Sequence, residues 1–212
     1  MAREEGISRI TMWPLETDKV GSKPTFGELF PLPWAVNFET EDEYREGQYY
    51  GDNIVEQSKK SISKVTVDME VSSDTPPSLD AKITGKGYKG GMAYKNIGDK
   101  TPAYAVGYEI LMSDGNIRRR IIYNVGFTRN SHTNKTIEDE AEGQTYTYSG
   151  VGLPLASTGD VEAMMDLAEI EAVSDEAEKT WLKERWDKFF ESPVLPEEYT
   201  PSVVAAKNKY IL

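Results

Sequence analysis

The segment from residue 103 to 128 is the feature that most restricts what this chain can fold into. It reads AYAVGYEILMSDGNIRRRIIYNVGFT, in which two runs of alternating apolar residues flank Ser-Asp-Gly-Asn. Alternation with a period of two is typical of a strand with one buried face. Asp-Gly is a preferred pair for the centre of a two-residue hairpin loop. The segment therefore predicts an antiparallel β-hairpin that turns at Asp114–Gly115.

The loop length predicts which side chains face each other across this hairpin. A two-residue loop places Glu109 opposite Arg120, an ion pair worth about 0.2–1 kcal/mol. Arg118 shares the face of Arg120, whereas Arg119 interrupts the apolar face near the turn. The core face is expected to collect Tyr104, Val106, Tyr108, Ile110, Met112, Ile117, Ile121, Tyr123, Val125 and Phe127.

Four other segments carry patterns that predict secondary structure. KVTVDMEV (64–71) and TYTYSGVGL (145–153) alternate as strands do. TPPSLDAKITG (75–85) has the proline start and glycine stop of a short helix, and residues 174–190 carry the apolar stripe of a longer one. Residues 161–173 fit both a helical period and a two-residue period, so both assignments stay open.

Strand 64–71 is expected to present one apolar face and one solvated face. Its four apolar side chains alternate with four polar ones. The solvated set is Lys64, Thr66, Asp68 and Glu70.

These elements together predict a mainly β, α+β chain with a β-sandwich or barrel-like core and a flanking helix. We expect a single domain over 1–212, since this length suits one domain with arms. An N-terminal arm with edge strands and a long loop is expected over 1–60, and the β core over 61–155. A helical region over 156–192 and a C-terminal arm over 193–212 follow.

Composition argues against most catalytic chemistry. The chain has no cysteine and one histidine, His132, which lies in a polar stretch typical of a solvated loop. The acidic runs 39–46 and 138–142 lack the ligand spacing of a calcium loop, so no metal and no cofactor are expected. An enzyme is therefore not expected.

Charge and hydropathy limit the partners. There are 36 acidic against 24 basic residues, a formal charge of −12, which disfavours tight binding of nucleic acid. No apolar run approaches the roughly 20 residues of a membrane span, so no membrane partner is expected. The N-terminal MAREEGISRITMW has acidic residues where an export signal needs an apolar stretch.

An ordered set of motifs resembles the major tail proteins of long-tailed bacteriophages, specifically the phi13-type tail tube family. The set runs from YYGDNIVEQSKK (49–60) through GYKGGMAY (87–94) and the hairpin with its SDG turn to TYTYSGVGLPL (145–155). The matched elements span about half the chain. Where the family tends to have aromatic residues after the SDG turn, this chain has arginines.

The resemblance implies a tail-tube fold and a structural role. Subunits of that family form hexameric rings that stack into a hollow tube around a tape-measure protein, and genomic double-stranded DNA later passes through the lumen. The expected partners are other copies of the chain, the tape-measure protein and other tail proteins. The expected location is the virion, with assembly in the host cytoplasm.

Two surfaces are candidates for this assembly. The solvated face of strand 64–71 is expected to line the lumen, where acidic side chains would keep DNA from adhering. Arg118 and Arg119, near the hairpin tip, are expected to meet an acidic run on a neighbouring subunit. That run supplies Glu39, Glu41, Asp42 and Glu43.

Two other readings remain open. One is a monomeric β-sandwich binding module, for instance for glycans, with tyrosines and tryptophans as its platform. Such a module needs aromatic residues on a solvated face, whereas Tyr104, Tyr108 and Tyr123 share the expected core face. The other is an enzyme whose site leaves no recognisable motif.

The arginine hypothesis makes a direct prediction. Reversing Arg118 and Arg119 to glutamate is expected to leave the monomer folded but to impair tube formation, because the pairing with the neighbour's acidic run is lost. Electron microscopy of the purified variant checks this, and normal tubes would reject the contact.

Overall fold

The computed structural model describes residues 2–32, 34–51, 54–72, 75–129 and 145–200. His132, the acidic run 138–142 and the end of the C-terminal arm, 201–212, lie outside the described residues. The expectations made for them above are therefore not tested.

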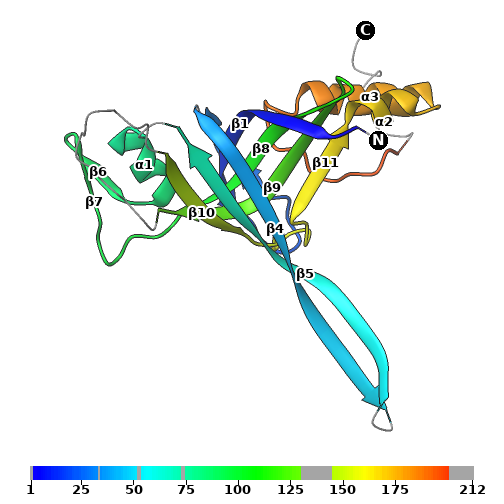
Figure 1. Cartoon of the computed structure of the whole chain (residues 1–212), viewed down its shortest axis with the longest axis horizontal. Helices are drawn as coiled ribbons and strands as arrows, with labels where there is room; N and C mark the ends of the chain where they lie inside the picture. The colour runs from blue at the N-terminus through cyan, green and yellow to red at the C-terminus, as the bar shows by residue number, and fades with distance from the viewer. Residues whose placement is uncertain (1, 33, 52–53, 73–74, 130–144, 201–212) are drawn as a thin grey trace, which may run out of the picture.

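Most of the chain belongs to one large antiparallel sheet (Figure 1). Its path runs β2-β1-β8-β9-β10-β5-β4, with β3 beside β1 and β11 beside β9. The predicted mainly β fold with a few helices is confirmed. The strands are β1 (Glu4–Thr17), β2 (Thr25–Phe26), β3 (Phe30–Pro31), β4 (Ala35–Gly51), β5 (Ile54–Val71), β8 (Ala103–Met112), β9 (Ile117–Thr128), β10 (Tyr146–Gly152) and β11 (Glu162–Asp166).

The sheet curls around a hydrophobic core. The rings of Phe38 on β4 and Tyr108 on β8 are 4.6 Å apart, although three strands separate β4 from β8 along the sheet. The alternating apolar residues of 64–71 line this core, as the sequence predicts. The short helix α1 (Pro77–Thr84) adds the fully buried Ile83, and Gly85, at φ 74°, ends this helix in the left-handed conformation.

The opposite face of β8 and β9 is also buried. It carries a second apolar cluster that includes Trp13, Tyr123 and Phe189, the last just after helix α3 (Glu176–Asp187). Gly107 makes room for this cluster, since a Cβ there would lie 2.9 Å from the Trp13 ring. The sequence predicted one buried face for the hairpin, and the structure shows two.

The predicted hairpin exists, but its register differs from the prediction by one residue. The Gly115 amide donates to the Met112 carbonyl at 2.9 Å, and the Met112 amide donates to the Asn116 carbonyl at 2.9 Å. The loop is therefore three residues long, with Gly115 at φ 82° as the left-handed residue that such loops require. Glu109 faces Arg119, and the predicted pairing of Glu109 with Arg120 is wrong.

A β-bulge shifts the faces of β9 a second time. Tyr104 pairs with Val125 and Val106 with Ile122, so β9 has one extra residue at this point, where Asn124 has a φ of 51°. The predicted core face of β8 is confirmed. On β9, by contrast, Ile121 and Tyr123 lie in the second cluster instead of the core. The bulge is also where β9 changes partner, from β11 before it to β10 after it.

The ambiguous residues 161–173 are both strand and helix. They form β11 and then helix α2 (Leu167–Ala172). Asp166 ends the strand and caps the helix, because its carboxylate accepts from the amides of Ala168 at 2.9 Å and Glu169 at 3.3 Å. The longer helix predicted at 174–190 is present as α3.

The N-terminal third is more regular than the sequence predicts. Residues 1–60 were expected to form an arm with edge strands and a long loop, but β4 and β5, with 17 and 18 residues, form a long hairpin that projects from the body (Figure 1). The acidic run 39–46 lies within β4. Residues 41–47 of β4 are exposed, so this stretch lacks the apolar alternation that reveals a half-buried strand. β1, expected to be part of an arm, lies inside the sheet.

A separate two-stranded hairpin lies at the end of the molecule that holds α1 (Figure 1). It consists of β6 (Gly87–Lys89) and β7 (Met92–Tyr94). The glycine-rich GKGYKGG of the sequence forms its first strand and its turn, which agrees with a connecting role.

Candidate functional site: surfaces for assembly

The arginine triplet is paired within the chain. The guanidinium of Arg118 contacts the Asp166 carboxylate at 2.6 Å, and that of Arg120 contacts the Glu162 carboxylate at 2.5 Å. Both acids come from β11, which runs beside the arginine-bearing half of β9. Hydrogen bonding to Asp166 raises the pKa of Arg118, so this guanidinium is held in its charged form.

Arg119 is the buried member of the triplet. Its side chain lies between Glu109, at 2.9 Å, and the ring of Trp186, whose centroid is 4.0 Å away. It also donates to the Trp186 carbonyl. Both Arg119 and Glu109 are only 9% exposed.

A second arginine completes this buried site. Arg9 contacts the Glu109 carboxylate at 3.3 Å and lies 4.1 Å from the centroid of the Phe190 ring. Glu109 therefore joins two arginines to the aromatic residues at the end of α3. The predicted meeting of Arg118 and Arg119 with a neighbour's acids stays untested, but each has an acidic partner in its own chain.

A solvated face of β5 and β4 is rich in acidic side chains. The register places Glu39 opposite Asp68 and Glu43 opposite Lys64. The half-buried Lys64, Thr66, Asp68 and Glu70 alternate with buried apolar residues, as predicted. The acidic members contributed by β4 and β5 are Glu39, Glu41, Glu43, Asp68 and Glu70.

This register joins two sets of residues that the sequence assigned to different roles. Glu39, Glu41 and Glu43, expected at a subunit contact, share one face with the strand expected to line the lumen, whereas Asp42 faces Val65 on the other side. Lys64 contacts Glu43 at 2.9 Å and lowers the pKa of its carboxyl. The directly opposed Glu39 and Asp68 have no ion-pair partner among the described residues.

Two strand edges are open for pairing. Among the described strands, β4 pairs with β5 alone along its whole length. The first half of β1, up to Ser8, pairs with β8 alone. A cavity of about 320 Å³ beside that edge is lined by Ile7, Leu32 and Trp34, and Trp34 is 53% exposed. Unpaired edges are templates for strand addition by another chain.

A buried polar cluster around Asp80 holds α1 in place. Asp80 accepts from Lys86 at 2.6 Å and from the Tyr148 hydroxyl at 2.9 Å, and Arg129 lies 3.6 Å away. Burial works against ionisation of Asp80, but these contacts outweigh it and lower the pKa of its carboxyl. The Tyr148 oxygen accepts in turn from the Thr75 hydroxyl, at 2.8 Å. The carboxylate is satisfied by its neighbours, which is typical of a structural cluster.

Two further features concern the described part of the chain. No group of three or more histidine, cysteine or acidic side chains is arranged to hold a metal ion. None of the helices is long and apolar enough to cross a membrane.

Comparison with known proteins places the chain in no family. No family model and no curated protein matches it. A solved structure with some likeness is the sixfold-symmetrised cryo-EM structure of the anti-feeding prophage baseplate. It has a TM-score of 0.33 and 12% identity, over 78% of this chain and 97% of that one. The likeness is weak and establishes no relationship.

Several residues of these surfaces were not identified from the sequence. Glu162 and Asp166 were missed because their strand pairs with the middle of β9, a contact without a local signal. The sequence does carry a sign that the acidic residues of β4 share one face, since Glu39, Glu41 and Glu43 recur every second residue. That period indicates one face of a strand, even where the face is acidic.

The arginine geometry predicts a stability effect that differs from the sequence-based expectation. Arg119→Glu places a second carboxylate against buried Glu109, so we expect a loss of about 3–5 kcal/mol in the free energy of unfolding. Arg45→Glu, on the exposed part of β4, is the matched control and is expected to change it by less than about 0.5 kcal/mol. Urea unfolding measures both, and equal effects would contradict the buried pair.

The acidic face predicts a stabilising substitution. Glu39→Lys turns a like-charge pair across β4 and β5 into an attractive one, so the free energy of unfolding should rise by about 0.5 kcal/mol. Glu41→Lys, opposite the uncharged Thr66, is the control and should gain less. The difference should disappear in about 1 M salt. If the two variants behave alike at low salt, Glu39 and Asp68 are not opposed.

Proposed function

We propose that this chain is the structural subunit of a phage tail tube, assembling into hexameric rings that stack into a hollow tube for DNA delivery. The ordered motifs between residues 49 and 155 support this reading. The observation that carries it is the projecting β4–β5 hairpin with its open edge (Figure 1).

The projecting part of this hairpin is built to contact something outside its own chain. Residues 44–51 of β4 pair only with β5, over a length of roughly 25 Å. An isolated two-stranded hairpin is marginally stable in water, so this length needs an external surface. We propose that a neighbouring copy, in the same ring or the next one, supplies it.

Ring closure can use the open edges of the sheet. The edges of β4 and of the first half of β1 lie on different strands of the sheet path, so pairing one with the other is a head-to-tail contact. Such contacts close into rings when the rotation allows it. The number six comes from the family resemblance alone.

The acidic face is the proposed wall of the lumen. Five acidic side chains and Lys64 lie on the solvated side of β4 and β5. Six copies at −12 each carry roughly −72, a field that repels DNA phosphates and lets the duplex pass without adhering. The further proposed partners are the tape-measure protein and other tail proteins. The proposed location is the virion, after assembly in the host cytoplasm.

The alternative readings have less support. For a glycan-binding module, Tyr104, Tyr108 and Tyr123 are unavailable as a platform because they are at most 3% exposed. For an enzyme, the buried Asp80 cluster is the strongest candidate, and its acid is paired. We therefore propose a non-enzymatic role without a cofactor.

Electron microscopy of the purified protein at high concentration tests the proposal. We expect rings or tubes with a wall about one subunit thick. A variant in which a short turn replaces residues 45–61 should remain folded but form no tubes, because those residues pair only with each other. Its thermal midpoint provides the control for folding. A strictly monodisperse monomer of the full-length chain would refute the proposal.

A further inference from the structure

The β6–β7 end of the molecule carries an apolar surface that its own chain does not cover. Tyr88, Met92 and Tyr94 of this hairpin are between 46% and 67% exposed. Ile97, just beyond β7, is fully exposed at 107%. Met92 and Tyr94 share one face of the hairpin, and Tyr88 lies on its other face. Single exposed apolar residues are common, but four within ten residues are a concentration of the kind found at interaction sites.

The turn that presents Ile97 is held by hydrogen bonds. The Asn96 amide donates to the Asp99 carboxylate at 2.7 Å, and the Asp99 amide donates to the Asn96 carbonyl at 3.0 Å. The Gly98 amide donates to the Asn96 side chain at 3.2 Å. Ile97 is therefore displayed on an ordered turn, which lowers the entropy cost of burying it against a partner.

Lysines surround this patch in an otherwise acidic protein. Residues 82–100 contain five lysines and one aspartate. Lys86 is paired with Asp80, and Lys82 lies over the Phe30 ring. The exposed Lys89, Lys95 and Lys100 take part in no ion pair among the described residues. We call residues 86–100 the basic end.

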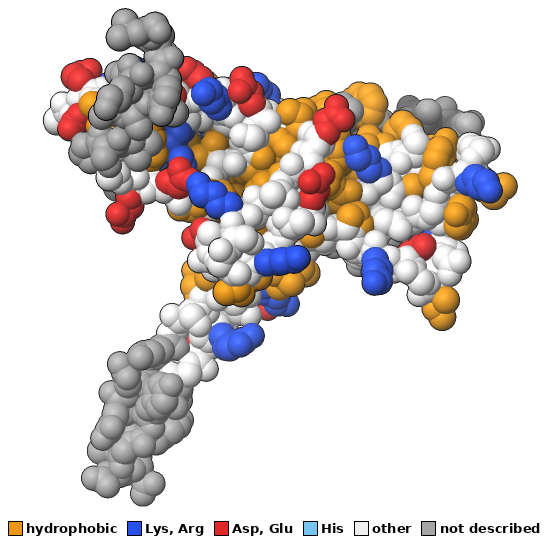
Figure 2. All heavy atoms as spheres, turned by 180° about the vertical axis from the view of Figure 1, so that it is seen from behind, with side chains coloured by type: hydrophobic (Ala, Val, Ile, Leu, Met, Phe, Trp, Pro, Cys, Tyr) orange, Lys and Arg blue, Asp and Glu red, His pale blue; other side chains and the backbone are white. Residues whose placement is uncertain are grey.

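The region of α3 has the opposite charge. Residues 169–191 contain eight acidic and four basic side chains. Glu184, Asp187 and Glu191 are exposed and form no ion pair within the described part of the chain. Figure 2 shows acidic side chains gathered at this end, and lysines beside hydrophobic side chains at the other.

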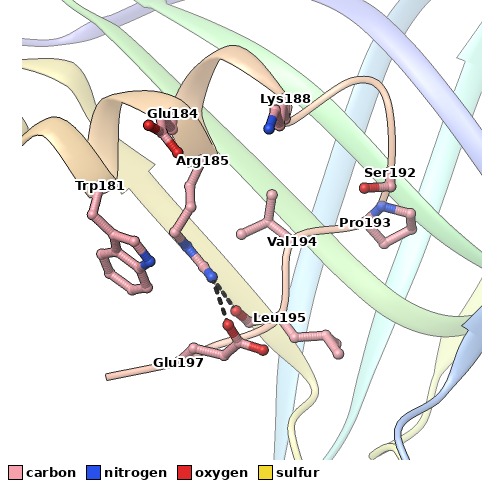
Figure 3. Close-up of a pocket in the computed structure, with 9 residues that line it drawn as sticks. All are labelled: Trp181, Glu184, Arg185, Lys188, Ser192, Pro193, Val194, Leu195 and Glu197. Carbon is pink, nitrogen blue, oxygen red and sulfur yellow. Dashed lines mark hydrogen bonds and ion pairs between the residues drawn. The ribbon is translucent and has the colours of Figure 1, made fainter. Parts of the chain in front are cut away.

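A cavity of about 300 Å³ lies between α3 and the segment after it (Figure 3). Its apolar walls are Trp181, Val194 and Leu195, and Glu184 stands at its margin. Arg185 and Lys188 also line the cavity, and Glu197 contacts both Arg185, at 3.0 Å, and Lys23, at 2.6 Å. We call the cavity, together with the exposed acids Glu184, Asp187 and Glu191, the acidic groove.

The basic end and the acidic groove lie at opposite ends of the longest axis of the molecule (Figure 1). One copy therefore cannot bring them together, whereas two copies in a head-to-tail arrangement can. A contact between two different surfaces of the same chain repeats from copy to copy, which gives a ring or an open chain.

We propose that the basic end of one copy docks into the acidic groove of the next copy. Ile97 and the exposed Met92 supply the apolar anchor for the cavity, and Lys89, Lys95 and Lys100 face the exposed acids of α3. The inference rests on the proposed function only in requiring a second copy of the chain. A nucleic acid would also suit lysines beside tyrosines, but the charge of −12 disfavours it.

A charge swap tests the contact. Lys89→Glu with Lys95→Glu makes both ends acidic, and Glu184→Lys with Asp187→Lys makes both ends basic. Each variant alone should associate at least about tenfold more weakly, and mixing the two should restore association because every junction is then complementary. Lys19→Glu with Arg3→Glu, which makes the same change in net charge at exposed sites elsewhere, should behave as the unmodified chain.

Sedimentation velocity and electron microscopy read out the test, with circular dichroism and thermal unfolding as controls for folding. Ile97→Ser provides an uncharged variant that should also weaken association. The docking would be overturned if the variants associate as well as the unmodified chain, or if mixing them does not restore association. If normal tubes form in that case, the proposed function still stands. Open chains that respond to the swap without forming rings would support the docking and refute the tube.

Two outcomes would overturn the docking in other ways. A strictly monomeric unmodified chain would refute both the docking and the tube. The second outcome is measured by fluorescence anisotropy with duplex and single-stranded DNA. If the lysine variant loses DNA binding while its assembly is unchanged, the basic end is a nucleic-acid site.

Discussion

The buried contact between Glu109 and Arg119 is the interaction on which the arrangement of sheet and helix depends. The two residues face each other on the central strands, and both are removed from water. Burying two charges is costly unless every group finds a partner. Arg9 and the Trp186 carbonyl supply the remaining partners, so the charges are satisfied only when β1 and the end of α3 are both in place. One ion pair therefore joins β1, β8, β9 and α3.

Two β-bulges, one in β1 and one in β9, flank β8 and allow the sheet to curl around its core. Arg9 on β1 and Asn124 on β9 have φ values of 54° and 51°, a conformation that non-glycine residues rarely adopt. Each lies where the pairing with β8 slips by one residue. A bulge increases local twist and redirects the strand. Arg9 is at once the bulge residue and a partner of Glu109, so the backbone irregularity and the ion pair reinforce each other.

The sequence predicts those parts of the fold that depend on local patterns. The strands at 64–71 and 145–153, the hairpin and both predicted helices could be read because one face of each is apolar. The register of the hairpin could not, because a one-residue change in loop length and the bulge at Asn124 leave almost no trace in composition. The projecting hairpin could not be predicted for another reason, since a strand with both faces exposed shows no apolar period. The partners of the arginines depend on β11, whose position is a tertiary contact.

Association of copies that each carry −12 must overcome repulsion, and the structure distributes its charges accordingly. Glu39 and Asp68 are directly opposed without a cation, an arrangement that costs stability and that packing does not require. By contrast, each of the three arginines 118–120 of β9 is paired with an acid of its own chain. Within the described residues, Lys89, Lys95 and Lys100 form no ion pair and lie near the exposed apolar residues of the β6–β7 end. If the acidic surfaces of two copies repel each other and only the β6–β7 end attracts another copy, the copies can bind each other in few orientations. The proposed docking therefore brings oppositely charged surfaces together, while the excess of acidic residues disfavours other orientations.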